Sequence, residues 1–428
     1  MVFLTHNPAV MGDFAVPMAP PVAAAARTAE AEAKERAAVV ETNTDATEAK
    51  YSAIAAGYWD DPFVAHFVSP AARAHIHKPP LINRGTTARV AAIDSAVRHF
   101  FARGGRQVVV LGAGFDTACA RLHAAGALPA DARWAEVDLP EVCAAKRARI
   151  AASAPLRAAF PAPPTYTLHS VDLRDVDALA RALLMPNKSS SSVSVVGKAA
   201  AGEATTETKE TEATRTTTGT GTRTTTVTTE QEEPCANLDP TQPTLFVSEV
   251  VLVYLDAGAG DRVVAWAGSE FRCALFVTFE QIEPGDAFGR VMLANIAARG
   301  CALRSVAAYP TAAAQCARYR ARGFAHVAAH DMNRVWAQLV ASDAAAARHV
   351  AALEIFDEVE EWQLLQAHYC FVVAVRDPDR LLASDSTDLF AFMLPYTPRP
   401  AALLPAWNRH APQHLPIHPV LGGGAPRP

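Results

Sequence analysis

Short apolar runs alternate with longer amphipathic stretches through the middle of this chain. The runs that combine apolar and β-branched residues, and so predict buried strands, lie at 108–114, 134–139, 165–173, 244–255, 274–282 and 368–376. The stretches whose apolar residues recur at helical spacing include 90–103, 286–299 and 311–322. Because strands that alternate with helices are typical of βαβ units, the pattern predicts an α/β fold with a mainly parallel sheet.

Three segments lack this alternation. Residues 1–41 are rich in Ala and Pro and offer few large apolar side chains, so a flexible N-terminal tail is expected. Residues 186–238 form a Ser/Thr/Glu tract that cannot offset its ordering entropy, which predicts a disordered insertion. Residues 377–428 are expected to form a Pro-rich C-terminal tail. The remaining chain, 42–376, is predicted to be one domain, and the insertion leaves its core undivided.

Composition and charge exclude several classes of protein. Half of the 428 residues are hydrophobic, so a sizeable core is available. The 39 Lys and Arg against 44 Asp and Glu give a net charge of −5, which argues against nucleic acid as a partner. No apolar run reaches the length of about 18 residues that a membrane span requires. No basic region precedes an apolar run at the start of the chain, so no secretory signal is expected.

The cysteines and histidines indicate a reducing compartment and no metal centre. Seven cysteines, an odd number without a CxxC motif, are typical of free thiols, so the cytoplasm or the nucleus is expected. No cluster of His and Cys has the spacing of metal ligands, so no metal is predicted. These features describe a soluble intracellular protein, which we expect to be monomeric.

A glycine motif follows the first predicted strand. In Leu-Gly-Ala-Gly-Phe-Asp-Thr (111–117), Gly112 and Gly114 allow a sharp turn and a close approach of the backbone to a ligand. Thr117 replaces the third glycine of the dinucleotide fingerprint, so the motif does not favour a pyrophosphate site. Alone, the motif favours a plain tight turn over a ligand site.

Three acidic residues near the ends of later strands change this interpretation. Asp138 ends the second predicted strand, close to the spacing at which a carboxylate binds ribose hydroxyls, although it is also placed to cap a helix that begins at Pro140. Asp172 follows the third strand, where it can accept from an adenine amino group or simply form a turn. Glu249 interrupts an apolar strand, which is costly unless the carboxylate is paired or contacts a ligand.

Several longer stretches carry the sequence pattern of a known family. They are TNTDATEAKYSAIAAGYWDDPFVAHFV (42–68), INRGTTARV (82–90), VVVLGAGFDTACARL (108–122), EVDLPEV (136–142), VDLRDV (171–176), PTLFVSEVVLVYL (243–255), FEQIEPGDAFGRVM (279–292) and LEIFDEVEEWQLLQAHYC (353–370). Over about 42–376, apart from the insertion, the chain resembles the leucine carboxyl methyltransferases. These enzymes use S-adenosylmethionine to methylate the C-terminal leucine of the protein phosphatase 2A catalytic subunit. The resemblance implies a Rossmann-like class I methyltransferase fold, with helices on both faces of the sheet and an N-terminal helical lid.

The resemblance also implies the residues of the cofactor site. The positions that match the family's S-adenosylmethionine contacts are Lys50, Arg89, Gly112, Asp138, Asp172, Leu173 and Glu249. Lys50 and Arg89 are expected near the cofactor's own carboxylate, where an arginine can engage both oxygens, although each is also consistent with a solvated helix face. Arg84 and Tyr254 are weaker candidates for orienting the substrate carboxylate, and Tyr254 is equally consistent with packing against a strand.

The expected reaction is simple in its acid–base requirements. A C-terminal carboxylate has a pKa of about 3.3–3.7, so it is already a nucleophile at neutral pH and needs no general base. The rival interpretations are a small-molecule O-methyltransferase of the same superfamily and a non-catalytic protein that binds the phosphatase tail. The related tRNA wybutosine methyltransferases carry a long C-terminal propeller extension. Only a short Pro-rich tail follows here, so we expect the leucine carboxyl methyltransferase activity.

Overall fold

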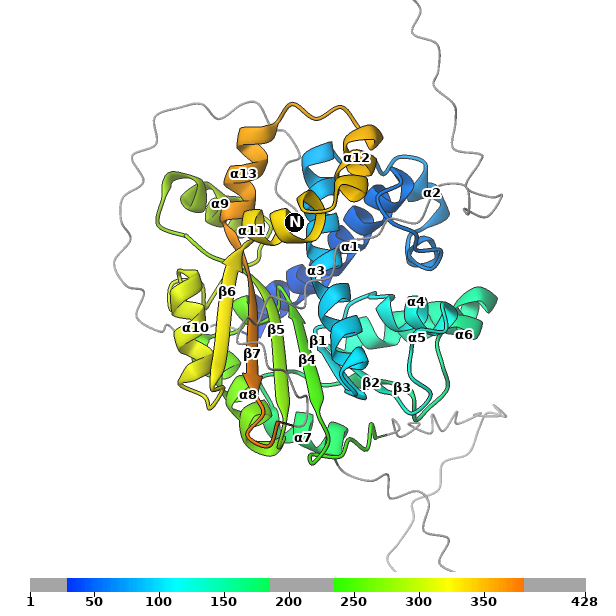
Figure 1. Ribbon diagram of the computed structural model, residues 1–428, viewed down its shortest axis with the longest axis vertical. Coiled ribbons are helices and arrows are strands. Elements are labelled where there is room, and N and C mark those ends of the chain that lie inside the picture. The colour runs from blue at the N-terminus through cyan, green and yellow to red at the C-terminus, as the bar shows by residue number, and fades with distance from the viewer. Residues whose placement is uncertain (1–28, 185–234, 381–428) are drawn as a thin grey trace, which may run out of the picture.

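The computed structural model describes residues 29–184 and 235–380 of the chain (Figure 1). Most of the sequence-predicted tails and insertion, at 1–28, 185–234 and 381–428, therefore lies outside the described residues.

Seven strands form one mixed sheet. They are β1 (Gln107–Leu111), β2 (Arg133–Asp138), β3 (Tyr166–Ser170), β4 (Thr244–Glu249), β5 (Ala274–Gln281), β6 (His326–Asp331) and β7 (Tyr369–Arg376). Their order in the sheet is β3-β2-β1-β4-β5-β7-β6. The first five strands pair in parallel, and β7 runs antiparallel to both β5 and β6. The predicted α/β fold with a mainly parallel sheet is confirmed.

Helices surround the sheet. They are α1 (Ala29–Ala55), α2 (Pro70–Arg73), α3 (Pro80–Ala102), α4 (Ala118–Ala124), α5 (Pro140–Ala152), α6 (Ala154–Ala159), α7 (Val176–Leu184), α8 (Ala257–Glu270), α9 (Ala287–Ala298), α10 (Ala312–Arg320), α11 (Met332–Trp336), α12 (Ala344–Leu353) and α13 (Val359–Ala367). Shorter helical turns are η1 (Val64–Phe67), η3 (Leu252–Tyr254) and η4 (Ala337–Ala341).

The alternation of side chains along β1 divides the core between the two faces of the sheet. Val108 and Val110 belong to a buried cluster with apolar side chains of α3, α4 and α5. Val109 and Leu111 alternate with these residues along β1 and belong to a second buried cluster, with side chains of α7, α8 and α10. Because both faces of β1 are covered, the strand is a continuous apolar run, as parallel strands in the middle of a sheet usually are.

The strand order reverses between β1 and β4, and this position determines where a ligand can bind. The chain leaves β1 toward β2 on one side, whereas β4 pairs with the opposite edge of β1. Leu111 of β1 is the register partner of Ser248 of β4. The glycines after Leu111 and the carboxylate of Glu249 therefore lie at the carboxyl ends of two neighbouring strands. Open α/β sheets bind ligands in the crevice at such a reversal.

Helix starts in this fold have recognisable local causes. Pro80 and Pro140 occupy the first turns of α3 and α5, where the missing N–H has no partner to lose. Asp286 accepts from the backbone N–H of Gly289 at 2.6 Å and so caps α9. Thr311 caps α10 in the same way.

The predicted boundaries of the domain need correction. Helix α1 begins at Ala29, so the predicted tail 1–41 was too long, and the domain extends at least thirteen residues further toward the N-terminus. This helix packs against α3 mainly through small side chains, including Ala49 and Ala53, which a search for large apolar residues does not detect. At the other boundary, Ala236 and Leu238 are buried against α7, so the predicted insertion 186–238 ended too late.

Two strand predictions also need correction. The expected strand at 244–255 ends at Glu249, because the chain turns at Val250 into η3. No strand was predicted at 326–331. There β6 forms a sheet edge with only Val327 buried, so it lacks the apolar run of the central strands. Within the described ranges, no helix has the length and apolar character needed to cross a bilayer.

Candidate functional site

A cavity of about 590 Å³ lies at the carboxyl ends of β1, β2 and β4, beneath α1 and α3. We call it the central cavity. The residues predicted for the cofactor site that line it are Lys50, Arg89, Gly112, Asp138, Asp172, Leu173 and Glu249. The fold therefore brings together seven positions that the sequence scatters over 200 residues. Tyr254 lines the same cavity, whereas Arg84 is not among the lining residues.

The glycine motif forms a tight loop that only glycine accommodates at two positions. Gly112 and Gly114 have φ values of 63° and 53°, in the left-handed region that side chains disfavour. A Cβ atom on Gly112 would lie 2.5 Å from a methyl group of Val251, and one on Gly114 would lie 2.5 Å from Oδ1 of Asn43. The two glycines therefore allow the loop to pack closely against Val251 and Asn43 at the wall of the central cavity.

Asp138 holds this loop. Its Oδ2 accepts from the backbone N–H of Gly114 at 2.6 Å, and its Oδ1 accepts from the N–H of Leu139 at 2.7 Å. The N-cap of α5 is Leu139, so the alternative role of Asp138 as the cap of that helix is not what the structure shows. Burial raises the pKa of Asp138, and the two backbone hydrogen bonds only partly oppose this.

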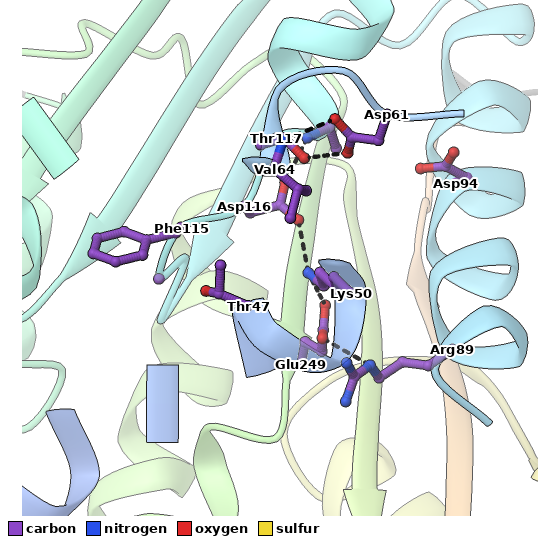
Figure 2. Close-up of polar contacts among 12 residues, drawn as sticks. Thr47, Lys50, Asp61, Val64, Arg89, Asp94, Phe115, Asp116, Thr117 and Glu249 are labelled. Carbon is purple, nitrogen blue, oxygen red and sulfur yellow. Dashed lines mark hydrogen bonds and ion pairs between the residues drawn. The ribbon is translucent and has the colours of Figure 1, made fainter. Parts of the chain in front are cut away.

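Four charged residues form a chain of ion pairs across the cavity wall (Figure 2). Arg89 of α3 pairs with Glu249 at 2.9 Å, Lys50 of α1 lies 3.4 Å from the same carboxylate, and Lys50 also pairs with Asp116 at 3.1 Å. The side chain of Arg89 is only 2% exposed, and that of Glu249 is 19% exposed. The carboxylate that interrupts the apolar β4 is thus compensated by two cations, both of which also line the central cavity.

Lys50 and Asp116 keep their charges at neutral pH. Burial opposes ionisation of Asp116, but Lys50 and Lys146 outweigh it and hold the pKa of Asp116 at about 2. Burial likewise favours neutral Lys50, yet Glu249 and Asp116 keep its pKa above the ordinary value. Lys50, Arg89, Asp116 and Glu249 therefore form two positive and two negative charges, which cancel.

Thr117, the residue in place of a third glycine, has its own partner. Its hydroxyl donates to Asp61 Oδ2 at 2.6 Å (Figure 2). Asp61 is buried and also pairs with Arg121 of α4 at 3.2 Å, while Arg121 binds Asp94 of α3 through both guanidinium amino groups. The hydrogen bond of Thr117 to Asp61 thus connects the glycine loop to the segment that precedes η1.

Asp172 and Leu173 lie at the far end of the cavity. Asp172 pairs with Arg174 at 2.6 Å and with Arg36 of α1 at 3.4 Å. Its Oδ1 also accepts from the backbone N–H of Arg174, so the predicted turn is present together with the cavity position. Leu173 is buried, and its side chain belongs to the core on the α7 and α8 face.

The two candidates for orienting a substrate carboxylate differ in position. Tyr254 borders the central cavity, and burial raises its pKa, so its phenol stays protonated and can donate. The guanidinium of Arg84 lies 3.8 Å from the centre of the Phe356 ring, away from the residues that line the cavity. The structure therefore places Tyr254 at the site and does not bring Arg84 there.

Sequence reasoning missed three residues that shape the site. Asn43 of α1 accepts from the N–H of Phe115 at 2.9 Å, Asp116 pairs with Lys50, and Arg36 joins α1 to Asp172 and to Glu141 of α5. Asn43 and Asp116 lie inside stretches that carry the family resemblance, which is the signal that would have marked them. Arg36 lies in the segment that was predicted to be a tail.

Comparisons with known proteins identify relatives of this chain. The model of the family described as leucine carboxyl methyltransferase matches residues 38–196. A leucine carboxyl methyltransferase 1 homolog of Arabidopsis thaliana is 32% identical over 357 residues, which cover 80% of this chain and 90% of the relative. The leucine carboxyl methyltransferase 1 of Aspergillus fumigatus is 33% identical, covering 77% of this chain and 80% of the relative.

Two further similarities complete the comparison. The human tRNA wybutosine-synthesizing protein 4 is 32% identical over 384 residues, which cover 84% of this chain but only 48% of that protein. Among solved structures, a putative methyltransferase from Thermobifida fusca is 14% identical with a TM-score of 0.40, covering 77% of this chain and 94% of that one. The extent and identity of the match to its full-length relatives establish that this chain belongs to the leucine carboxyl methyltransferase family.

Proposed function

We propose that this chain transfers a methyl group from S-adenosylmethionine to the C-terminal leucine carboxylate of the protein phosphatase 2A catalytic subunit. The product is a methyl ester, whose formation regulates assembly of the phosphatase holoenzyme. The observation that supports this most is the central cavity, where a glycine loop, Asp138 and Glu249 meet two cations at the strand reversal. Membership of the family supports the choice of a leucine carboxyl group.

The chemistry of the lining residues fits S-adenosylmethionine, which carries a sulfonium, an ammonium, a carboxylate and a nucleoside. Asp138 would accept from the ribose hydroxyls, and Asp172 would accept from the adenine amino group. Arg89 and Lys50 would bind the carboxylate of the cofactor, and Glu249 would face its positively charged groups. The bare backbone at Gly112 leaves space that a Cβ would occupy. When bound, the cofactor supplies an electrophilic methyl group and a neutral thioether leaving group.

The protein's own part is positioning and charge balance. The acceptor is a carboxylate that is ionised at neutral pH, so no side chain has to remove a proton. Because Lys50 and Arg89 are already paired with Asp116 and Glu249, no unbalanced cation remains in this cluster to hold the acceptor carboxylate too tightly. The Tyr254 phenol can orient an acceptor oxygen without a full charge. Enclosure beneath α1 and α3 excludes water, which would otherwise solvate the nucleophile.

A labelled-methyl transfer assay with purified phosphatase catalytic subunit tests this proposal. We expect one base-labile methyl group per acceptor, as an ester requires, and no transfer to a catalytic subunit whose C-terminus is amidated. Transfer to the amidated form would show that another acceptor atom is used. Absence of transfer to either form, together with tight binding of the phosphatase tail, would favour a non-catalytic tail-binding protein.

Two other acceptor classes belong in the same assay. The similarity to part of the human tRNA wybutosine-synthesizing protein 4 calls for a tRNA fraction as a parallel acceptor. A small-molecule carboxylate extract tests the O-methyltransferase alternative. Label that appears in either fraction and not in the phosphatase would overturn the proposed substrate while leaving the methyl-transfer chemistry in place.

A further inference from the structure

The loop that follows Glu249 is strained. Val250 has φ 55°, in the left-handed region that a β-branched residue rarely occupies. Its N–H donates to the carbonyl of Phe279 on β5 at 2.8 Å, and the chain then turns into η3. Such a conformation persists only where surrounding contacts enforce it.

A buried carboxylate lies directly behind this turn. Glu280 of β5 is completely buried, and its Oε1 accepts from the N–H of Leu252 at 3.0 Å and faces the N–H of Val251 at 3.4 Å. Among the described residues its Oε2 has no hydrogen-bond partner. A buried polar group is expensive unless it is hydrogen-bonded, and Oε1 of Glu280 is bonded to the turn. Burial raises the pKa of Glu280 to about 7, so the carboxyl is partly neutral near neutral pH, and its Oε1 accepts from the turn in either form. Arg318 of α10 supplies an opposite charge nearby.

The turn that Glu280 holds forms one wall of the central cavity. Val250, Val251 and Tyr254 all line the cavity, and a methyl group of Val251 occupies the space that a Cβ on Gly112 would need. A shift of the turn would therefore move the phenol of Tyr254 and the surface that faces the glycine loop. From the other side, Ser305 Oγ donates to the carbonyl of Leu252 at 3.0 Å, so the turn is held at both its N–H and its carbonyl groups.

We propose that Glu280 is a positioning residue for methyl transfer. It does not line the cavity, and it acts by accepting backbone hydrogen bonds that keep Val250–Tyr254 in the strained conformation required at the site. The proposal rests on the proposed function for its kinetic consequence, but its structural consequence is independent of that function. It assigns the role to the acceptor oxygen of Glu280, which a glutamine amide can also provide.

Three variants separate positioning from general stability. Glu280→Ala removes the acceptor, and Glu280→Gln retains it without the charge. Thr278→Val is the matched control, because Thr278 is fully buried two residues earlier on the same face of β5 and its hydroxyl binds Tyr319, away from the turn. Each variant is first checked for folding by circular dichroism and a melting curve. Hydrogen exchange of the peptide spanning 249–255 is then measured without any ligand.

We expect amide exchange in this peptide to rise at least about tenfold in Glu280→Ala, as loss of the hydrogen-bond acceptor implies, and to change less than about threefold in Glu280→Gln and Thr278→Val. In the transfer assay, kcat should fall at least about tenfold in Glu280→Ala, with a smaller change in the KM for S-adenosylmethionine, and Glu280→Gln should restore most of it.

Two results would overturn the proposal. One is a folded Glu280→Ala protein whose 249–255 peptide exchanges as slowly as in the parent protein. The other is a Glu280→Gln protein as impaired as Glu280→Ala, which would mean that charge and not the acceptor oxygen is what matters. If the parent protein itself transfers no methyl group, the proposed function fails, and the exchange experiment still decides the role of Glu280.

Discussion

Asp138 illustrates how a single carboxylate serves both the loop and the ligand. Each of its oxygens accepts from a backbone N–H, one of them from Gly114, while the side chain still borders the central cavity. A carboxylate oxygen has two lone pairs, so a ribose hydroxyl can share an oxygen that already accepts from the backbone. The proposed ribose contact therefore requires no rearrangement of the glycine loop.

Substitutions of Asp138 separate these two roles. Asp138→Asn keeps one oxygen for the N–H of Gly114 but loses the charge and places its amide NH2 against the N–H of Leu139. We therefore expect the Kd for S-adenosylmethionine to rise at least about tenfold with a modest fall in Tm. Asp138→Ala loses both acceptors and should weaken binding further while also lowering Tm. Titration calorimetry measures the affinity, and an Asp138→Ala protein that binds as tightly as the parent would refute the ribose assignment.

The depressed pKa of Asp116 makes a prediction about pH. Its pKa is about 2 in the folded protein against an ordinary value of 3.8, so ionised Asp116 stabilises the fold at every pH above about 4. This contribution, about 2 kcal/mol, is lost as the pH falls from about 4 toward 2, because protonation breaks the pairing with Lys50.

Denaturant unfolding of the ligand-free protein measures this effect. The free energy of unfolding of Asp116→Asn should lie about 2 kcal/mol below that of the parent protein at pH 7, and the difference should shrink below pH 4. A difference that stays constant from pH 7 to pH 3 would show that the Asp116 charge does not stabilise the fold, and that the variant acts through packing.

At this scale, the sequence predicts residue types better than it predicts partners. Gly112 and Glu249 stand out because glycines after a strand, or a carboxylate inside an apolar run, each need a local explanation. The pairing of Lys50 with Glu249 joins positions 199 residues apart, and no periodicity carries that information. It arises only when α1 crosses the end of β4, so the expectation that Lys50 faces a ligand alone missed its protein partner.

At the scale of an element, helix α1 likewise shows that long-range contacts are harder to predict than local patterns. The strands were predictable because a buried strand appears in the sequence as a run of apolar, often β-branched, residues. Helix α1 instead covers the cavity with short side chains and polar contacts. Its neighbouring residues Glu35 and Arg36 pair in opposite directions, with Arg304 and with Glu141. A helix held by such long-range ion pairs has almost no amphipathic signal, which explains why residues 29–41 were predicted to be a tail.

Truncation tests the corrected boundary. Removal of residues 1–28 should leave cofactor affinity within about twofold of the parent, because every described residue that lines the cavity is retained. Removal of residues 1–41 deletes Glu35, Arg36, Val39 and Val40 from the wall, so the Kd for S-adenosylmethionine should rise at least about tenfold. Equal affinities of the two truncated proteins would show that the first half of α1 contributes nothing to the site.

At the scale of the whole molecule, the residues that flank the insertion are far apart in sequence but close together in space. The described chain stops at Leu184, the end of α7, and resumes at Cys235 beside the same helix. The N–H of Ala236 donates to the carbonyl of Ala182 at 3.1 Å, and the N–H of Leu238 donates to that of Leu183 at 2.9 Å. The residues that flank the intervening segment are thus already joined by backbone hydrogen bonds beside α7.

Deletion of residues 188–234 should therefore be tolerated. The ends need only a short glycine-serine linker, and each halving of a flexible loop lowers the entropic cost of closing it by about 0.6 kcal/mol. If the segment adds no packing, as its composition predicts, the shortened protein should melt at the same temperature as the parent or a few degrees higher. Methyl transfer should stay within about twofold. A fall of more than about 10 °C would correspond to well over 1 kcal/mol and would show that the Ser/Thr/Glu tract packs on the domain after all.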